Sequence, residues 1–186
     1  MISNKSDRRV RYTKMVLKNA LIDLMEEKPI SKITIKEICE KADINRGTFY
    51  AHYTDQFDLQ NQIFEDILIR INEYMDAAPY IPGSPEARAM LTGVFRYASE
   101  NRRIIKVLIS ENSTIHLQDE VLQFLVTRRV FEGYPVQPAM AEYLYNYIAF
   151  GCVGLVRKWL TDGTESPEQF ADLVMQLTGT GLVSFR

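Results

Sequence analysis

The chain of 186 residues lacks the long apolar runs that mark membrane and secreted proteins. No stretch approaches the roughly 20 uninterrupted apolar residues that a membrane helix needs. Residues 1–15 are basic, and no apolar secretory core follows them. The only two cysteines, Cys39 and Cys152, lie far apart among apolar neighbours and form no Cys-x-x-Cys pair, so both are expected to be reduced core thiols. These absences lead us to expect a cytoplasmic protein.

Residues that carry enzyme chemistry are also scarce. The two histidines, His52 and His116, leave few parts for a zinc site or a histidine-based catalytic set. The sequence contains no G-x-S-x-G motif, no phosphate-binding loop and no paired catalytic set. We therefore expect no catalytic residues, no metal, no cofactor and no enzymatic activity.

Charge is distributed unevenly along the chain, although the net charge is only -2. Residues 1–53 contain 11 Lys/Arg and 7 Asp/Glu, whereas residues 54–186 contain 11 Lys/Arg and 17 Asp/Glu. A basic first part on an acidic remainder suggests that only the first part meets a polyanion. This excess of positive charge is small enough to arise by chance, so the sequence motifs have to decide whether the first part binds a polyanion.

Apolar residues recur at helical spacing through almost the whole chain, and no run alternates as a strand would. We therefore expect an all-α fold. Thr34 with Glu37 is a capping-box signature, and Asn45 and the pair Ser166-Pro167 are further helix starts. The expected helices cover residues 7–27, a short helix from 34, one opening at 45, a long one from 54 to the break at 77–85, then 86–99, 102–111, 115–131, 139–161 and 167–178.

The stretch NRGTFYAHY, residues 45–53, has an unusual composition for a structural helix. At about 100° per residue, Phe49 and Tyr53 share one side and would pack inward, while Gly47 and Ala51 lie opposite. Polar side chains frame this strip of small residues: Arg46, Thr48, Tyr50 and His52. Such a face suits a helix that enters the DNA major groove. The alternative is that Gly47 sits in a permissive first turn and that the polar residues are ordinary surface residues.

The run TIKEICEKADINRGTFYAHYTDQFDL, residues 34–59, closely resembles the helix-turn-helix of the tetracycline-repressor (TetR) family of bacterial transcriptional regulators. The resemblance extends upstream, so that it covers roughly residues 9–65. It implies a three-helix DNA-binding domain joined by a long helix to a helical regulatory and dimerisation domain. We expect the boundary between residues 1–55 and residues 56–186.

Carried over by position, the resemblance implies a set of DNA contacts: Arg46, Gly47, Thr48, Tyr50 and His52 toward the groove, Thr34 and Lys36 at the second helix, and Arg8, Arg9 and Arg11 at the first. Arg46 is the candidate reader of guanine, whereas Tyr50 and His52 would contact phosphates. One departure from the family is that Asp55 and Gln56 replace a lysine common at the start of its connecting helix.

The last two expected helices resemble those of one branch of the family, in which they pair with a second subunit. The expected dimer interface is apolar with two glycines: Phe150, Gly151, Gly154, Leu155, Trp159, Phe170, Leu173 and Leu177. The alternative is that both helices bury these residues within one subunit. Aromatic residues and methionines that could line an effector pocket, or simply form core, are Met90, Phe95, Phe124, Tyr143 and Tyr147.

The resemblance implies a transcriptional regulator that binds a palindromic double-stranded DNA operator as a homodimer. Repression with release by a small-molecule effector is the family's usual behaviour. An alternative is a co-activator or a regulator that depends on a partner protein. Salt-sensitive, specific binding to DNA distinguishes a DNA-binding regulator from a protein that only docks a partner.

Overall fold

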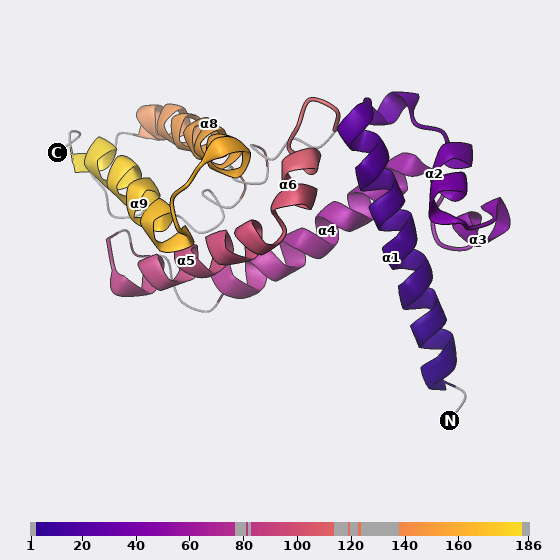
Figure 1. The fold of residues 1–186 in the computed structure, drawn as a ribbon. Coiled ribbons are helices and arrows are strands. Elements are labelled where there is room, and N and C mark those ends of the chain that lie inside the picture. Colours follow the sequence, from indigo (N-terminus) through magenta and orange to yellow (C-terminus); the bar gives the residue numbers. More distant parts are fainter. Residues whose placement is uncertain are drawn as a thin grey trace. The chain divides into compact units, whose positions relative to one another are not determined.

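The computed structural model describes residues 3–76, 81, 83–113, 119, 123 and 138–183, and the regular structure in these residues is helical throughout (Figure 1). The all-α expectation is confirmed. Contacts divide the chain into two compact units. We call residues 1–68 with 107–115 the head unit, and residues 69–106 with 116–186 the body unit.

The head unit begins with three helices and a short 3-10 turn, whose bounds are α1 Ser3–Glu27, η1 Ile30–Lys32, α2 Ile35–Ala42 and α3 Arg46–Tyr50 (Figure 1). The first helix was expected from residue 7 and starts four residues earlier. It ends before Pro29, as expected, because proline lacks the N–H that would continue the helix. The 3-10 turn was not expected from the sequence.

The core of the head unit combines apolar side chains from every one of these helices and from the first part of α4, Gln56–Met75. Its fully buried members include Leu17, Leu21, Ile38, Phe49 and Leu59. Because α2 and α3 are short, this burial rather than helix propensity holds them in place.

The head unit also contains a segment that is distant in the sequence. Val107, Leu108 and Ile109 are at least 93% buried there. Asn112 follows; its side-chain amide donates to the carbonyl of Met25 at 2.9 Å, and its own carbonyl accepts from the N–H of Ile30 at 3.0 Å. Residues 107–113 therefore help to close the end of α1, which the helical periodicity did not indicate.

The body unit contains α5 Pro85–Glu100, the start of α6 Arg102–Leu108, α8 Pro138–Asp162 and α9 Pro167–Val183. Relative to expectation, α6 ends three residues earlier and α9 continues five residues further. Ser84 and Ser166 cap α5 and α9, each with a side-chain oxygen that accepts a first-turn N–H. Most of the helix expected at 115–131 lies outside the described residues.

Two ion pairs tie α5 to α9 within the body unit. Arg88 forms two hydrogen bonds with the carboxylate of Asp172, at 2.6 and 2.8 Å, and Arg96 forms one with Glu168 at 2.8 Å. Thr92 lies one helical turn from each arginine. Its hydroxyl is buried and has no hydrogen-bond partner among the described residues.

A cluster of three aromatic rings fills the adjoining core. Trp159 and Phe170 stack with centroids 4.5 Å apart and an interplanar angle of 6°, and Phe95 meets Phe170 edge-on at 4.7 Å. The guanidinium of Arg102 lies 5.9 Å from the Trp159 ring and donates to the carbonyls of Trp159, Leu160 and Gly163. It therefore caps the C-terminal end of α8, where the helix dipole favours a cation.

Candidate nucleic-acid interface

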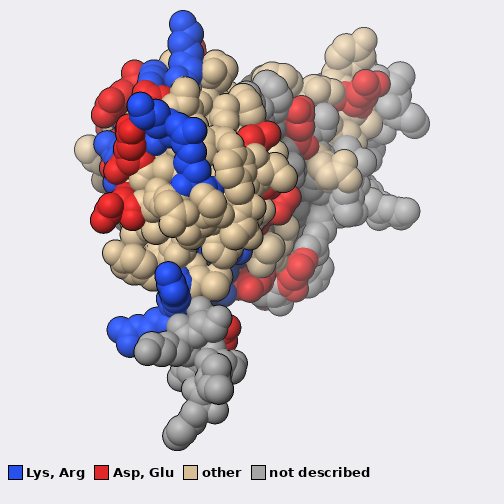
Figure 2. Space-filling model, turned by 90° about the vertical axis from the view of Figure 1, so that its right-hand side faces the viewer, with Lys and Arg blue, Asp and Glu red and all other residues tan. Residues whose placement is uncertain are grey.

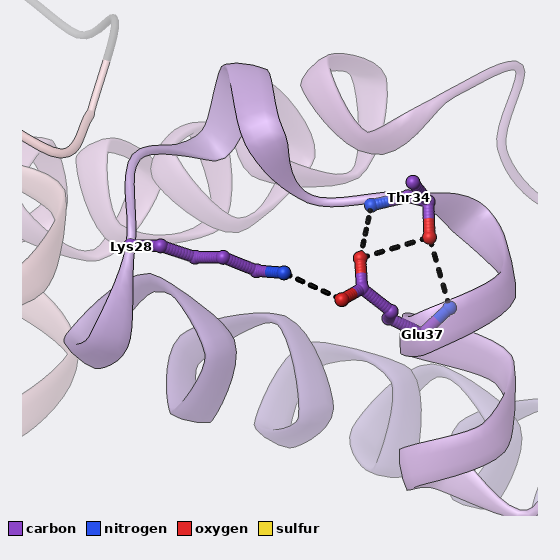
Figure 3. A network of polar contacts seen from close by, with 3 residues as sticks. All are labelled: Lys28, Thr34 and Glu37. Carbon is purple, nitrogen blue, oxygen red and sulfur yellow. Dashed lines mark hydrogen bonds and ion pairs between the residues drawn. The ribbon is translucent and has the colours of Figure 1, made fainter.

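The start of α2 is fixed by the network of Thr34, Glu37 and Lys28 (Figure 3). The Thr34 hydroxyl accepts the Glu37 N–H at 3.2 Å, and a Glu37 carboxylate oxygen accepts from the Thr34 N–H at 2.9 Å. This is the capping box that the sequence predicted. Lys28 adds an ion pair to the other carboxylate oxygen, which the sequence did not indicate. The hydrogen bond from Lys28, with those from Thr34, lowers the pKa of Glu37 from 4.5 to about 2.

This network affects the two residues expected to contact phosphate at α2. The Thr34 hydroxyl is already engaged, since it also donates to Glu37 at 2.8 Å. Lys36 is exposed and lies 3.7 Å from Glu40, a loose surface pair that leaves it accessible. Of the two, Lys36 has the freer side chain for a phosphate.

The turn between α2 and α3 sets the direction of α3. Asp43 ends α2 in the left-handed conformation, with φ 53° and ψ 45°, and its N–H reaches the carbonyls of Cys39 and Glu40. Asparagine and aspartate tolerate this conformation better than most residues. Asn45 then caps α3 as expected, because its side-chain oxygen accepts the Thr48 N–H at 2.7 Å.

The structure sorts the residues of α3 as the helical wheel predicted. Phe49 and Tyr53 are 0% and 5% exposed, and their rings pack 5.7 Å apart. Gly47 and Ala51 are exposed on the outer side, with Tyr50 57% exposed. The helix is shorter than expected, since it ends at Tyr50 with Ala51 as its C-cap. A hydrogen bond from the Tyr53 N–H to the Phe49 carbonyl at 3.0 Å keeps the helical relation between these two residues.

The polar residues around this strip are accessible to differing degrees. Arg46 is fully on the surface, whereas Thr48 and His52 are half-buried. Arg46 also borders a shallow hollow of about 410 Å³ between α2 and α3, whose lining is Lys36, Cys39, Glu40, Asp43, Ile44, Asn45 and Arg46. Burial raises the pKa of the Cys39 thiol, which keeps it in the neutral form. The lining of the hollow therefore contains two cations and an amide but also the carboxylates of Glu40 and Asp43.

Arginines at the start of α1 are exposed, as their expected phosphate role requires: Arg8, Arg9 and Arg11. Figure 2 shows how charged side chains are distributed on one face. Lysine and arginine side chains lie above and below a broad uncharged area, and acidic side chains lie to both sides of it. Such a border of cations suits contact with two phosphate chains on either side of a groove.

The start of α4 is acidic instead of basic. The Asp58 N–H donates to the Asp55 carboxylate at 2.8 Å, and the Thr54 N–H donates to the Asp58 carboxylate at 2.8 Å. The latter bond lowers the pKa of Asp58. Two carboxylates therefore occupy a helix end that could otherwise attract phosphate, so Gln56 is not a substitute for the family's lysine.

The residues expected at a dimer interface divide into two groups. Exposed members are Phe150 at 61%, Leu173 at 38% and Leu177 at 48%, together with Gly151 and Gly154. Leu155 is half-buried. Trp159 and Phe170 are only 4% and 2% exposed, because they stack on each other inside the subunit. The structure therefore places these two rings in the core of the body unit.

The residues expected to line an effector pocket also separate. Met90 and Phe95 are buried in the body unit, and Phe95 contacts Trp159 and Phe170. Tyr143 and Tyr147 are 74% and 75% exposed on α8, so neither ring shares an enclosed site with Met90 or Phe95. Phe124 lies outside the described residues.

The part of the chain that the structure describes offers neither a metal-binding cluster nor a membrane-spanning helix. No group of three or more His, Cys, Asp or Glu side chains there is placed to hold a metal ion. None of the described helices is both long enough and apolar enough to cross a membrane.

A capped second helix, a left-handed turn and a third helix with a small, polar-framed outer face define a helix-turn-helix DNA-binding protein. Two family models match the chain: bacterial regulatory proteins of the tetR family over residues 19–61, and a transcriptional regulator C-terminal region over residues 86–179. The chain belongs to the TetR family of transcriptional regulators, which are DNA-binding proteins and not enzymes.

Relatives of known sequence or structure agree with this assignment. The chain is 25% identical over 165 residues to YxbF, an uncharacterized HTH-type transcriptional regulator of Bacillus subtilis (strain 168); the match covers 87% of this chain and 43% of YxbF. The chain thus spans less than half the length of this relative.

Solved structures show the same fold at low sequence identity. A TetR transcriptional regulator from Streptococcus agalactiae 2603V has a TM-score of 0.68 at 19% identity, over 95% of this chain and 98% of that one. The fatty acid degradation regulator FadR from Bacillus halodurans has a TM-score of 0.66 at 14% identity, over 91% of this chain and 96% of that one. The dihydroxyacetone kinase operon activator DhaS has a TM-score of 0.60 at 22% identity, over 94% of this chain and 98% of that one.

Proposed function

We propose that the protein is a homodimeric repressor that binds a palindromic operator in the cytoplasm and is released by a small-molecule effector. The observation that carries the DNA-binding part is the outer face of α3. There Gly47 and Ala51 are exposed, and Arg46 and Tyr50 project beside them from a helix whose other side is anchored by Phe49.

This face can approach base edges closely because its central side chains are small. Arg46 can donate two hydrogen bonds to the O6 and N7 atoms of guanine. The Ala51 methyl can contact only an apolar group such as the thymine methyl. Tyr50, Lys36 and the arginines of α1 would then hold the phosphate chains on either side of the groove.

The homodimer is supported by an apolar stripe on α8. Met140, Tyr143, Tyr147 and Phe150 recur at helical spacing and are 45% to 75% exposed, with Gly151 and Gly154 continuing the same side. Among the described residues, a Cβ atom at either glycine would meet no atom beyond its own stretch of helix within 4 Å, so another helix can come close there. Large exposed apolar stripes of this kind usually mark an interface. We assign Tyr143 and Tyr147 to this surface, and leave Met90 and Phe95 as candidates for the wall of an effector site.

The first test of this proposal is a selection of genomic DNA fragments by the purified protein, followed by titration of the selected operator at several salt concentrations. Wild-type protein should bind one sequence with a steep salt dependence. If a small-molecule effector controls binding, addition of cell extract or of metabolite pools should release the protein from the operator. Activation of the adjacent gene, or a need for a second protein, would instead favour the co-activator alternative.

Arg46→Ala should weaken binding to the selected operator by about 1 to 3 kcal/mol and relax the preference at one base pair. The measurement is a binding titration on the operator and on each single-base variant. Arg70→Ala, at an exposed arginine of α4 in the body unit that pairs with Glu73, is the matched control and should bind as wild type. Equal losses on all sequences would show that Arg46 contacts only phosphate.

A further inference from the structure

Asn112 holds the connection between α1 and α2, although it follows α6 in the sequence. Its side-chain amide donates to the Met25 carbonyl at 2.9 Å, and its main-chain carbonyl accepts the Ile30 N–H at 3.0 Å. The helix itself offers Met25 no donor four residues on, because that residue is Pro29, which has no N–H. Asn112 therefore supplies a hydrogen bond that the sequence of α1 cannot make.

The turn that carries Asn112 is held by burial and by its own hydrogen bonds. Leu108 and Ile109, just before it, are 1% and 3% exposed in the head unit. The Ser110 hydroxyl donates to the Val107 carbonyl at 2.7 Å and accepts the Asn112 N–H at 3.2 Å. Asn112 thus reaches the end of α1 from a fixed position.

Lys28 lies between the two positions that Asn112 holds. Its ammonium pairs with the carboxylate of Glu37, which also closes the capping box at the start of α2 (Figure 3). A lysine side chain loses much conformational entropy when an ion pair orders it. The pair therefore forms more readily where the backbone that carries the lysine is already fixed, as it is here on both sides.

We propose that Asn112 is a positioning residue for DNA binding. It fixes residues 25–30, so that Lys28 is held against Glu37 and steadies α2, which carries the turn to α3. Asn112 acts through α2 and does not itself contact DNA. This inference rests on the proposed DNA-binding function and adds to it a residue that lies beyond the helix-turn-helix in the sequence.

The decisive variant is Asn112→Ala, which removes the amide donor and leaves the main-chain carbonyl in place. It should remain folded by circular dichroism. Hydrogen exchange of the amides at the start of α2 should become faster than in the wild type, as measured by mass spectrometry. Affinity for the selected operator should fall about fivefold, as expected for the loss of one hydrogen bond.

Asn101→Ala is the matched control, because Asn101 is half-buried like Asn112 and its amide donates to the Tyr97 carbonyl at the same distance of 2.9 Å. This bond lies at the end of α5 in the body unit. Its loss should leave both hydrogen exchange in α2 and operator affinity as in the wild type.

A double-mutant cycle with Glu37→Gln tests whether Asn112 acts through the ion pair. Glu37→Gln alone should weaken operator binding. In that background Asn112→Ala should reduce affinity less than twofold, since the pair that it supports is already lost. Lys28→Met breaks the same pair while Asn112 is intact, and it should weaken operator binding about as much as Glu37→Gln does.

Three results would overturn the inference: additive losses in the cycle, wild-type affinity of Lys28→Met, or wild-type hydrogen exchange of α2 in Asn112→Ala. An equal loss of affinity in Asn101→Ala would also overturn it, since the effect would then be one of general stability. Absence of specific DNA binding by the wild type would overturn the proposed function instead. Hydrogen exchange needs no DNA, so it would still decide whether Asn112 positions α2.

Discussion

The side chain of Glu37 accepts hydrogen bonds from Thr34, the N-cap of its own helix α2, and from Lys28 in the segment after α1 (Figure 3). It thereby links the end of α1 to the start of α2. Since α2 carries the turn to α3, the carboxylate helps to position the surface proposed to bind DNA. Its lowered pKa connects this position to pH.

The free energy of unfolding of the head unit should decrease as the pH is lowered from about 4.5 to about 2, in part through Glu37. The folded pKa lies below the ordinary value, so the contribution of the carboxylate is complete above pH 4.5 and disappears as the folded pKa is approached. Glu37→Gln can keep the capping box but loses the ion pair. It should be less stable than wild type at pH 7, and the difference should shrink by pH 3 in urea titrations.

Glu65→Gln, at an exposed residue of α4, provides the control. Its free energy of unfolding should differ little from that of the wild type at either pH. A difference between wild type and Glu37→Gln that stays constant from pH 7 to pH 3 would contradict the assigned role of the carboxylate.

At the scale of elements, α5 and α9 illustrate how two helices are matched. The pairs Arg88–Asp172 and Arg96–Glu168 are exposed and lie about two turns apart on α5. Together they match the register of α5 to that of α9. Exposed ion pairs contribute little stability. The buried contacts between them contribute more, and Thr92 lies among these with a hydroxyl that has no hydrogen-bond partner in the described part of the chain.

Thr92→Val should raise the free energy of unfolding by about 1 kcal/mol, because it replaces the unpaired hydroxyl by a methyl group of similar size. The measurement is denaturant unfolding followed by tryptophan fluorescence, since Trp159 lies in the same core. Thr92→Ser is the counterpart: it keeps the hydroxyl, loses the methyl group and should be destabilised. Loss of stability in Thr92→Val would show that the hydroxyl has a partner, such as a buried water.

At the scale of the whole molecule, the exposed stripe on α8 links oligomeric state to operator binding. A two-fold dimer would present two α3 helices to half-sites about 34 Å, one turn of DNA, or a multiple of that apart. A monomer would contact only one half-site and lose most of the affinity. The interface is therefore testable through both properties.

Phe150→Glu should convert the dimer into folded monomers and weaken operator binding at least tenfold. Phe150 is 61% exposed in the single subunit, so the change should leave the fold intact, whereas a charge at buried Trp159 would unfold it. Sedimentation velocity reports the oligomeric state and circular dichroism the fold. Ala89→Glu, on the exposed side of α5, is the control for an added carboxylate. A Phe150→Glu protein that sediments like the wild type would place the interface elsewhere.

Much of the fold and part of the candidate site follow from local sequence signals. The caps at Thr34, Asn45, Ser84 and Ser166 join groups no more than three residues apart, so they are readable in one window. The sorting of α3 depends only on helical geometry. The left-handed Asp43 and the early end of α3 were not predicted, because both depend on how the turn packs against α2.

Contacts between distant segments could not be read in this way. Helical periodicity marks which side of α8 and α9 is apolar, but it does not state which apolar residues meet within the subunit. The periodicity therefore groups Trp159 and Phe170 with Phe150, whereas in the structure these two rings stack in the core. Val107–Ile109 belong to the head unit although they are distant from it in the sequence, and the bond from Asn112 to Met25 joins residues 87 positions apart.

The sequence by itself determined the all-α fold, the helix-turn-helix and the family, because these depend on spacing and on caps within a few residues. The tertiary structure decided which apolar side chains remain on the surface and which polar groups remain without partners. The physical reason is that burial and hydrogen-bond satisfaction are set by neighbours far away in the chain. Position 45 shows the local level: its sequence marked a helix cap, and the Asn45 side-chain oxygen accepts the Thr48 N–H in the structure.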